Sequence, residues 1–409
     1  MISEKNKAGT NKNHGSFESV RDPEAKHLEL RLVITGGGTG GHVFPGVAIA
    51  EEMEALCRLR CLWIGTGRPV ERRALEQKDW DYKILHVRPL KGGGAVNILQ
   101  SLVHLPLAIM KAAAVLKRFK PDVVLGVGGY VSGPVLAAAR ILRIPTAIHE
   151  QNLLPGLANK MAAKFVDRVF ISFEASRPYF SNKSIECAGN PVRKDILEQA
   201  ASPAGEPGNG STHILVLGGS QGASGLNRLV SSALKILFQS GQKFSVIHQT
   251  GAQDFQEMQA FYKDAGMDVA VNEFINEMGI AYSWADLIIC RAGATTLAEI
   301  TAVGKPVICI PYPHSADGHQ GLNARAIYDA GAGLYFEEGD VGAVRLASEI
   351  EKLMSSPETL ADMTVNARKL GRPEAAAMIA RSIIKLSHKN NDGEYSINAT
   401  RGETIHGHV

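Results

Sequence analysis

A short apolar strand that runs into a glycine-rich loop is the feature that most limits the folds open to this chain. Residues 32–34 form an apolar run rich in β-branched side chains, and five of the six residues from Gly36 to Gly41 are glycine. After Pro45, apolar residues recur at helical spacing. We therefore expect a buried parallel strand, a glycine loop and a helix that begins after Pro45, with His42 inside the loop.

A loop of this kind favours an anion such as a pyrophosphate. The N–H groups at the start of the following helix lack partners and lie at the positive end of the helix dipole. An imidazole beside such a loop, here that of His42, is a candidate acid or base. A purely structural glycine turn is the alternative.

A dinucleotide site is a second alternative for this loop, because its glycines fit G-x-G-x-x-G. That site needs an acidic residue at the end of the second strand, where it binds a ribose hydroxyl. The second strand is expected at residues 61–64, and no acid follows it before Glu71. NAD is therefore disfavoured. The Walker pattern of P-loop NTPases is absent from the sequence.

The same pattern returns in the second half of the chain. Residues 213–217 form an apolar strand, residues 218–225 read GGSQGASG, and residues 226–237 have helical spacing. Strand and helix signals alternate from residue 31 onward, which is typical of an α/β fold. A chain of 409 residues is too long for one small core. We expect two Rossmann-like domains whose parallel sheets face a cleft.

Composition indicates how the chain is divided. Residues 1–28 are polar and lack the apolar core of a secretory signal, so we expect a disordered extension. Residues 29–188 and 189–372 are the expected domains, 373–387 a terminal helix that packs back on the first domain, and 388–409 a polar tail. Five scattered cysteines without a C-x-x-C pair indicate neither a zinc site nor a disulfide framework, and a net charge of +3 does not indicate nucleic-acid binding.

Polar residues follow two further strands of the first half. The strand at 121–125 runs into a second glycine loop that holds Tyr130, and the strand at 146–149 ends in His149, Glu150 and Asn152. Ligands of open α/β sheets bind beyond the carboxyl ends of the strands. We therefore expect these residues near the first glycine loop. Ordinary hydrogen-bonded loop residues are the alternative for His149 and Glu150.

The second half carries a carboxylate and a polar loop. A helix is expected to begin at Thr295 and to hold Glu299 in its first turn, where a carboxylate is favourable. Such a carboxylate can accept hydrogen bonds from two ribose hydroxyls, and helix capping is the alternative. The loop at 313–323, with His319 and Gln320, is expected to bind a sugar. A His/Asp metal site is the weaker option, because these residues lack helical spacing.

Residues 97–120 form a strongly apolar helical segment flanked by lysine and arginine. Its uninterrupted apolar part is too short to span a bilayer. A buried crossover helix is one interpretation. An apolar face with a basic rim, which contacts an anionic membrane surface, is another. The two are compatible if different faces of the helix serve them.

Six motifs together resemble the MurG family of peptidoglycan N-acetylglucosaminyltransferases. They are GGGTGGHVFPG at 36–46, GVGGYVSGP at 126–134, IHEQN at 148–152, GNPVR at 189–193, LGGSQGA at 217–223 and CRAGATTLAEI at 290–300. The resemblance extends from Leu30 to Leu386. It implies a GT-B fold, UDP-N-acetylglucosamine as the donor and undecaprenyl-linked lipid I as the acceptor. It also implies a peripheral protein on the cytoplasmic face of the bacterial cell membrane.

The resemblance implies roles for individual residues as well. Glu299 would bind the ribose, the backbone at Ile275 the uracil, Asn152 the sugar, and Gln320 the sugar hydroxyls. The family usually has two adjacent glutamines where this chain has His319 and Gln320. The other expected substrate contacts are Thr39, Gly40, Gly41, Tyr130, Arg193, Ser220, Gln221, Ala294, Thr295, Thr296, Leu297 and Ala298.

These assignments lead to an inverting mechanism, in which the acceptor's 4-hydroxyl attacks an α-linked donor and gives a β-1,4 product. We expect His42 to be the base, with Glu150 and His149 as rivals. Charge on the departing UDP is expected to fall on loop N–H groups, Ser220 and Arg193. The chain's Asp-x-Asp, at residues 79–81, precedes a strand and should lie away from the cleft. We therefore expect no cofactor and no obligatory metal ligand.

Three other functions remain open. A related GT-B enzyme could glycosylate diacylglycerol, a non-catalytic membrane adaptor could use residues 97–120, and a nicotinamide oxidoreductase could use the glycine loops. The motifs at 126–134 and 148–152 argue against the first. The intact glycine loops and Glu299 argue against the second, and the missing acidic ribose residues argue against the third.

Overall fold

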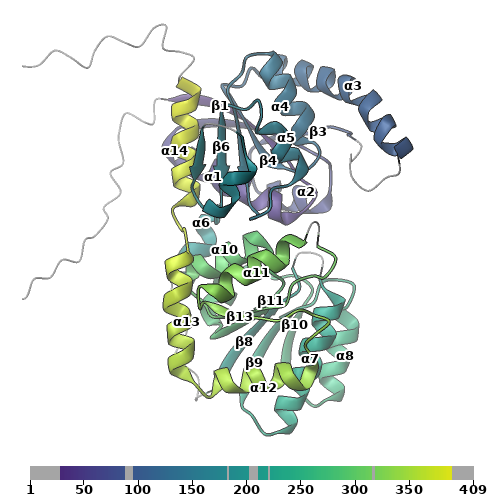
Figure 1. The fold of residues 1–409 in the computed structure, drawn as a ribbon, viewed down its shortest axis with the longest axis vertical. Coiled ribbons are helices and arrows are strands. Elements are labelled where there is room, and N and C mark those ends of the chain that lie inside the picture. Colours follow the sequence, from purple (N-terminus) through teal and green to yellow (C-terminus); the bar gives the residue numbers. More distant parts are fainter. Residues whose placement is uncertain are drawn as a thin grey trace, which may run out of the picture.

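The computed structural model describes residues 28–87, 95–181, 184–201, 211–219, 222–315 and 318–388, with the secondary structure alone for 95–104. The expected extension at 1–27, the substrate contacts Ser220 and Gln221, and the tail from residue 389 lie outside these ranges. Within them the chain forms two lobes, each built on one parallel sheet (Figure 1).

The first lobe contains a seven-stranded parallel sheet in the order β3-β2-β1-β4-β5-β6-β7. Its strands are β1 (Glu29–Gly36), β2 (Arg58–Gly65), β3 (Asp81–Ile84), β4 (Val123–Gly128), β5 (Thr146–Glu150), β6 (Arg168–Ile171) and β7 (Ile185–Cys187). The connecting helices are α1 (Gly40–Leu56), α2 (Pro69–Leu75), α3 (Ala95–Phe119), α4 (Ser132–Ile141), α5 (Leu157–Ala162) and the 3-10 helix η2 (Glu174–Tyr179). β1 pairs with both β2 and β4, so Val33 lies between Leu62 and Val124. The carboxyl ends of β1 and β4 therefore form the switch point at which such sheets bind ligands.

Helix α1 begins at Gly40, so the expectation of a helix after Pro45 with His42 in a loop is wrong. His42 lies in the first turn. Pro45 lacks the N–H that would bond to the carbonyl of Gly41. That carbonyl instead accepts a hydrogen bond of 3.1 Å from Thr295 Oγ1 in the second lobe. A donor from outside the helix thus replaces the one that proline removes, and the helix runs through Pro45.

The second lobe repeats the arrangement with six parallel strands in the order β10-β9-β8-β11-β12-β13. The strands are β8 (Thr212–Leu217), β9 (Phe244–Gln249), β10 (Val269–Asn272), β11 (Leu287–Cys290), β12 (Val307–Cys309) and β13 (Gly333–Tyr335). The helices are α6 (Lys194–Ala201), α7 (Ser224–Gln239), α8 (Phe255–Asp264), α9 (Met278–Trp284), α10 (Ala294–Val303), α11 (His319–Asp329), α12 (Ala343–Met354) and α13 (Pro357–Leu370). β8 pairs with both β9 and β11, which places a second switch point at their carboxyl ends.

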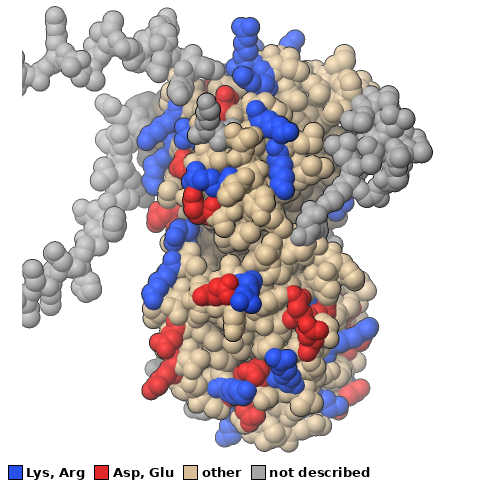
Figure 2. Space-filling model, viewed as in Figure 1, with Lys and Arg blue, Asp and Glu red and all other residues tan. Residues whose placement is uncertain are grey.

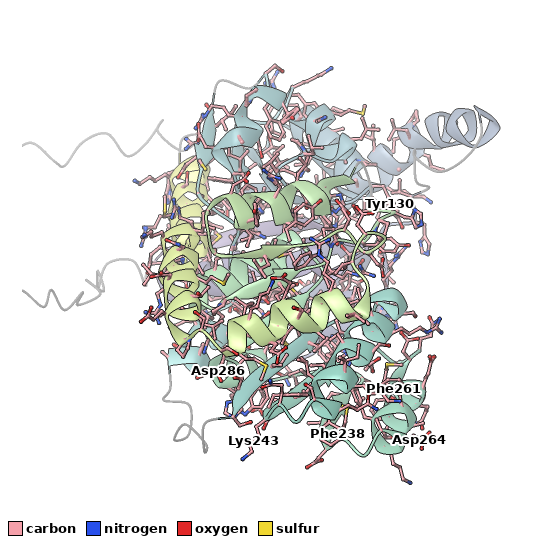
Figure 3. The ribbon with its side chains drawn as sticks, turned by 60° about the horizontal axis from the view of Figure 1, so that its bottom comes forward. Tyr130, Phe238, Lys243, Phe261, Asp264 and Asp286 are labelled. Carbon is pink, nitrogen blue, oxygen red and sulfur yellow. The ribbon has the colours of Figure 1, made fainter. Side chains whose placement is uncertain are left out.

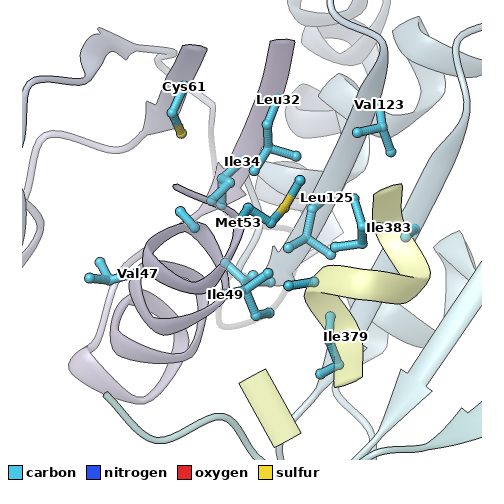
Figure 4. Close-up of a cluster of buried hydrophobic side chains, with 14 of the residues drawn as sticks. Leu32, Ile34, Val47, Ile49, Met53, Cys61, Val123, Leu125, Ile379 and Ile383 are labelled. Carbon is cyan, nitrogen blue, oxygen red and sulfur yellow. The ribbon is translucent and has the colours of Figure 1, made fainter. Parts of the chain in front are cut away.

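The last helix, α14 (Ala375–His388), lies beside the first lobe (Figure 1). Ile379 and Ile383 belong to the same buried cluster as Met53 of α1 and Leu125 of β4 (Figure 4). Arg168 of β6 also donates to Ser382 Oγ at 3.0 Å. The chain therefore crosses between the lobes twice, once after β7 and once between α13 and α14.

Helix α3 extends beyond the body of the first lobe at one end (Figure 1). Ala112 and Leu116 are buried in the core of the first lobe, whereas Leu107 and Met110 are exposed. The part of α3 with described side chains thus has one buried face and one exposed apolar face. Among the helices whose side chains are described, none is long and apolar enough to cross a membrane.

Candidate active site

The first turns of α1 and α10 meet at the boundary between the lobes. Thr295 Oγ1 donates to the carbonyl of Gly41 at 3.1 Å, and Asn190 Nδ2 approaches the same hydroxyl at 3.5 Å. The N-termini of both helices, with their unpaired N–H groups and positive dipole ends, therefore lie at this boundary. The structure brings these expected substrate contacts together: Thr39, Gly40, Gly41, Ala294, Thr295, Thr296, Leu297 and Ala298. Such an arrangement can hold a diphosphate.

His42 lies beside these helix starts and is partly exposed. Its Nδ1 is 3.3 Å from the hydroxyl of Thr39, the residue that precedes the helix. The ring also lies against Gly128, where an added Cβ would come within 2.9 Å of His42 Nε2. Burial, together with the smaller effect of the neighbouring His319, lowers the pKa of His42 to about 4. The imidazole is therefore neutral near pH 7 and can accept a proton.

The two rival bases at the end of β5 are buried and already hydrogen-bonded. His149 Nε2 is 3.1 Å from the carbonyl of Gly189, and Nδ1 is 3.2 Å from Gln151 Nε2. Burial lowers the pKa of His149 to about 4, against the raising effect of the Gly189 bond. The side chain of His149 thus joins β5 to the segment that crosses between the lobes.

Glu150 accepts four hydrogen bonds from the loop and helix that follow it. The donors are Asn152 N at 3.0 Å, Asn152 Nδ2 at 3.3 Å, Gly156 N at 3.1 Å and Asn159 Nδ2 at 2.9 Å. Burial raises the pKa of Glu150, and these bonds oppose the rise. The carboxylate therefore shapes the loop that carries Asn152.

Tyr130, which follows β4 by two residues, is partly exposed on the side of the molecule where α3 projects (Figure 3).

Glu299 lies in the second turn of α10, because the helix begins at Ala294 rather than Thr295; the expectation of a first-turn carboxylate is wrong. Its Oε2 accepts a hydrogen bond of 2.7 Å from the hydroxyl of Tyr282 in α9. Burial raises the pKa of Glu299 to about 7, although the Tyr282 bond and the charge of Arg193 oppose the rise. A carboxylate so placed can bind hydroxyl groups that enter from the lobe boundary.

Arg193 acts on this carboxylate through its charge and also contacts the first lobe. Its guanidinium lies over the ring of Phe44 in α1, at 4.9 Å from the ring centroid, and 3.4 Å from Asp195. Among the described residues, no hydrogen-bond partner is found for its buried Nε. A buried donor without a partner is costly, so this nitrogen is a candidate contact for a ligand.

Two further expected contacts lie on the second lobe. Ile275 is partly buried between β10 and α9. Gln320, at the start of α11, accepts a hydrogen bond from the backbone N–H of Tyr312 at 2.9 Å. Ser220 and Gln221 lie outside the described residues, and their neighbour Gly222 packs against the backbone of Thr250 with a left-handed φ of 79°.

Glu71 contributes to this site, although the sequence patterns assign it no role. Its carboxylate lies beneath the first glycine loop and accepts the N–H of Gly38 at 3.0 Å. It also accepts the N–H groups of Thr66 and Gly67, which directly precede α2. The available signal is a glutamate at the third position of a helix, where carboxylates bond back to the preceding N–H groups. Its contact with Gly38 depends on the packing of two loops and has no local signal.

Charge is distributed differently over the two lobes. Lysine and arginine side chains are prominent on the visible face of the first lobe, whereas acidic and basic side chains intermix on the second (Figure 2). In the described part of the chain, no group of three or more His, Cys, Asp or Glu side chains is arranged to hold a metal ion.

Comparison with known sequences assigns both halves to one family. The glycosyltransferase family 28 N-terminal domain matches residues 32–171, and the family's C-terminal domain matches residues 213–379. A UDP-N-acetylglucosamine–N-acetylmuramyl-(pentapeptide) pyrophosphoryl-undecaprenol N-acetylglucosamine transferase of Myxococcus xanthus is 43% identical over 358 residues, covering 87% of this chain and 93% of that protein. The transferase of the same name from Geobacter sulfurreducens is 42% identical over 362 residues, covering 88% of this chain and 100% of that protein.

Solved structures agree with this assignment. MurG of Acinetobacter baumannii is 31% identical, with a TM-score of 0.70 over 87% of this chain and 99% of that one. The UDP-GlcNAc 2-epimerase of Neisseria meningitidis, 16% identical with a TM-score of 0.62 over 88% of this chain and 100% of that one, shares the fold alone. The expected GT-B fold is therefore confirmed. On the strength of the full-length relatives, the chain belongs to the MurG family of glycosyltransferases.

Proposed function

We propose that this protein moves N-acetylglucosamine from UDP-N-acetylglucosamine to the 4-hydroxyl of N-acetylmuramic acid in lipid I, with inversion, and so forms lipid II for peptidoglycan synthesis. Membership of the MurG family supports the activity. The observation that carries the proposal for this chain's own site is the meeting of the α1 and α10 N-termini at the Thr295–Gly41 hydrogen bond. His42 lies beside one helix start and Glu299 one turn inside the other.

The donor would bind mainly to the second lobe. Glu299 would accept the ribose hydroxyls, and the backbone at Ile275 would contact the uracil. The diphosphate would lie at the α1 and α10 N-termini, within reach of the unpaired Nε of Arg193. Gln320 and Asn152 would contact the sugar from the second and first lobes. Ser220 and Gln221 are proposed contacts from the second glycine loop.

His42 is the group best placed to take the acceptor's proton. It is partly exposed at the lobe boundary, whereas His149 and Glu150 are buried and held by internal hydrogen bonds. A pKa of about 4 makes a weak base in the free protein. A diphosphate bound nearby would raise that pKa, because a negative charge favours the imidazolium form. Donor binding would therefore strengthen the base before the acceptor attacks.

In the transfer step, the acceptor oxygen forms a bond to the anomeric carbon as the bond from that carbon to the UDP oxygen breaks. The hydroxyl proton passes to His42. UDP leaves with the electron pair of the broken bond, and the N–H groups of the two helix starts, together with Arg193, stabilise its added negative charge.

The acceptor's lipid chain makes a membrane contact part of the proposal. Helices α3, α4 and α5 pack in that order along the first lobe. They expose apolar side chains, including Met110 at 68% and Ile141 at 70%, together with Leu157 and Met161. The basic residues Lys111, Arg140 and Lys160 lie on the same three helices, and Arg143 follows the end of α4. Such a surface would bind an anionic membrane peripherally, on the cytoplasmic face.

We also propose the domain division 29–188, 189–372 and 373–387. Val192 and Ile196, which follow the first crossing, are buried in the core of the second lobe. Ile379 and Ile383, which follow the second crossing, are buried in the core of the first.

The experiment that tests the function measures transfer of labelled N-acetylglucosamine from UDP to a lipid I analogue, with EDTA present and diacylglycerol as a control acceptor. Product on lipid I alone would support the acceptor, the reaction and independence from a metal. Product on diacylglycerol alone would contradict the proposed acceptor. Absence of product in EDTA that returns with added magnesium would contradict the metal-free mechanism.

A further inference from the structure

The carboxylate of Glu71 is an internal anion placed under the first glycine loop. The side chain is fully buried (0% exposed) and carries no basic partner in a salt bridge among the described residues. Its hydrogen-bond donors are instead three backbone N–H groups and two hydroxyls, those of Gly38, Thr66, Gly67 and Tyr82.

The two oxygens of this carboxylate serve different segments. Oε1 accepts the N–H of Gly38 at 3.0 Å and the hydroxyl of Thr66. Oε2 accepts Thr66 N at 2.7 Å, Gly67 N at 3.0 Å and the Tyr82 hydroxyl at 2.8 Å. Oε1 therefore joins the loop after β1 to the loop after β2, whereas the partners of Oε2 in the described part of the chain lie in the β2–α2 loop and β3.

The space for this carboxylate exists because two neighbouring positions are glycine. A Cβ at Gly37 or at Gly65 would overlap the Glu71 carboxylate. In a dinucleotide site, the N–H groups of such a loop face a phosphate. Here the Glu71 side chain takes the N–H of Gly38, so this side of the loop is closed to a ligand. The opposite end, at Thr39 and Gly41, is exposed toward the second lobe.

The loop is held from other sides as well. Arg68 Nη1 donates to the carbonyl of Gly38 at 3.2 Å. A Cβ at Gly129, in the second glycine loop, would come within 2.6 Å of the carbonyl of Gly37. The next residue, Thr39, precedes α1 and contacts His42 Nδ1 at 3.3 Å. A displacement of Gly38 would therefore move the residue that orients the imidazole.

We propose that Glu71 is a positioning residue of the transfer reaction, which acts through Gly38 and Thr39 to hold His42 and the start of α1 in place. The inference rests on the proposed role of His42 as the base. Burial raises the pKa of Glu71, but the hydrogen bonds from Thr66, Tyr82, Gly38 and Gly67 outweigh burial, so the pKa is lowered and the group stays ionised near pH 7.

The substitution Glu71→Gln distinguishes the roles of the two carboxylate oxygens. Its amide nitrogen cannot accept a hydrogen bond, so one side of the carboxylate loses its donors. If the amide nitrogen replaced Oε2, it would face the backbone N–H groups of Thr66 and Gly67, which is unfavourable. If it replaced Oε1, it would face the single backbone N–H of Gly38, because the Thr66 hydroxyl can rotate and accept a hydrogen bond instead. The glutamine should therefore release Gly38 and keep the β2–α2 loop. Glu71→Asp should do the same while keeping the charge, because the shorter side chain no longer reaches Gly38.

We expect both variants to lower kcat by about 100-fold, the scale of an ångström-sized misplacement, and to leave the KM for UDP-N-acetylglucosamine within about twofold. Tyr82→Phe is the matched control, because it removes the hydroxyl that donates to Oε2 and accepts from Gly67 N, and it leaves Gly38 untouched. Its kcat should stay near that of the wild type. Thermal unfolding of all three variants measures how far each substitution destabilises the fold.

A kcat within about threefold of the wild type in both Glu71 variants would overturn the proposal. So would equal losses in Glu71→Gln and Tyr82→Phe, or a parallel loss of donor affinity, since these indicate a general structural role. If the wild type transfers nothing to lipid I, the proposed function fails separately. Amide hydrogen exchange at Gly38 and Thr39 then still tests the contact: it should be faster in Glu71→Gln than in Tyr82→Phe, and equal rates would contradict it.

Discussion

Two side chains on either side of the lobe boundary have pKa values that are displaced in opposite directions. Burial lowers the pKa of His42 to about 4 and raises that of Glu299 to about 7. In both cases the surroundings favour the neutral form, because a low-dielectric environment disfavours charge. A ligand would shift both back, since a diphosphate favours imidazolium and donating hydroxyls favour a carboxylate.

We expect UDP to bind more tightly as the pH rises through about 7. Glu299 must be ionised to accept from two ribose hydroxyls, and its raised pKa keeps it protonated below that pH. The groups that face it are Tyr282 of α9, Arg193 and Asp195. Calorimetric titration of UDP at several pH values measures how the affinity for UDP changes with pH. The Glu299→Gln variant should bind UDP roughly 10- to 100-fold more weakly above that pH, and its affinity should depend much less on pH. An unchanged pH dependence would mean that a group other than Glu299 causes it.

His42→Ala should lower kcat by roughly 10²- to 10⁴-fold, the usual contribution of a general base. Its donor affinity should stay near that of the wild type, because the proposed donor contacts lie mainly on the second lobe. Transfer kinetics and UDP calorimetry on one preparation separate the two effects. His388→Ala, at the end of α14, is the control and should transfer normally. Unchanged turnover in His42→Ala would remove this residue from the mechanism.

At the scale of elements, one hydrogen bond joins two helix starts. The carbonyl that Pro45 leaves without an intrahelical donor is the one that Thr295 binds. The contact therefore compensates for a proline in α1 and also sets the approach of α10. Each lobe supplies one helix start of the proposed diphosphate site, and this hydrogen bond joins the two.

Thr295→Val should weaken donor binding by about 2- to 10-fold, the cost of a lost hydrogen bond. Valine keeps the shape but leaves the Gly41 carbonyl without its donor. Thr301→Val is the matched control, because the Thr301 hydroxyl, among the described residues, bonds to the carbonyls of Leu297 and Ala298 in its own helix. Affinities for UDP-N-acetylglucosamine compare the two. Equal effects would mean that the contact between the lobes contributes nothing to donor binding.

Sequence patterns locate the strands of this fold and the residues after them. The predicted strands at residues 32–34 and 213–217 lie in β1 and β8, because an apolar run buried on both faces carries its own signal. The predicted start of α1 is too late in the sequence, because Pro45 predicts a helix break, whereas a hydroxyl from the other lobe binds the carbonyl that the proline leaves without a donor. The Glu71–Gly38 contact escapes prediction because it joins two loops that only the finished sheet brings together.

At the scale of the whole molecule, the lobes touch at points near the proposed site. Besides the Thr295–Gly41 bond, Arg193 lies over Phe44, and Arg73 of α2 lies over the ring of Phe274 at 5.0 Å. Domains of one chain are expected to move relative to each other unless their interface is large and hydrophobic. Opening at these contacts would expose both helix starts to an incoming nucleotide.

Charging the proposed membrane surface should release the protein from lipid. The double substitution Met110→Glu and Ile141→Glu places carboxylates on exposed apolar positions of α3 and α4. We expect recovery in flotation with anionic liposomes to fall at least tenfold, because two lost apolar contacts, each worth about 1.5–3 kcal/mol, weaken the affinity by more than about 100-fold. Val344→Glu, 74% exposed on the second lobe, is the control. Equal recovery of both variants would locate the membrane contact elsewhere.

The placement of α14 bears on how the chain is made. A ribosome completes residues 29–188 first, yet the cluster around Met53 and Leu125 also contains Ile379, Ile383 and Leu386. Until those residues emerge, the apolar surface of α1 that they cover stays open to water. The nascent first lobe is therefore incomplete throughout synthesis of the second, and α14, which is made after both sheets, completes the core of the first.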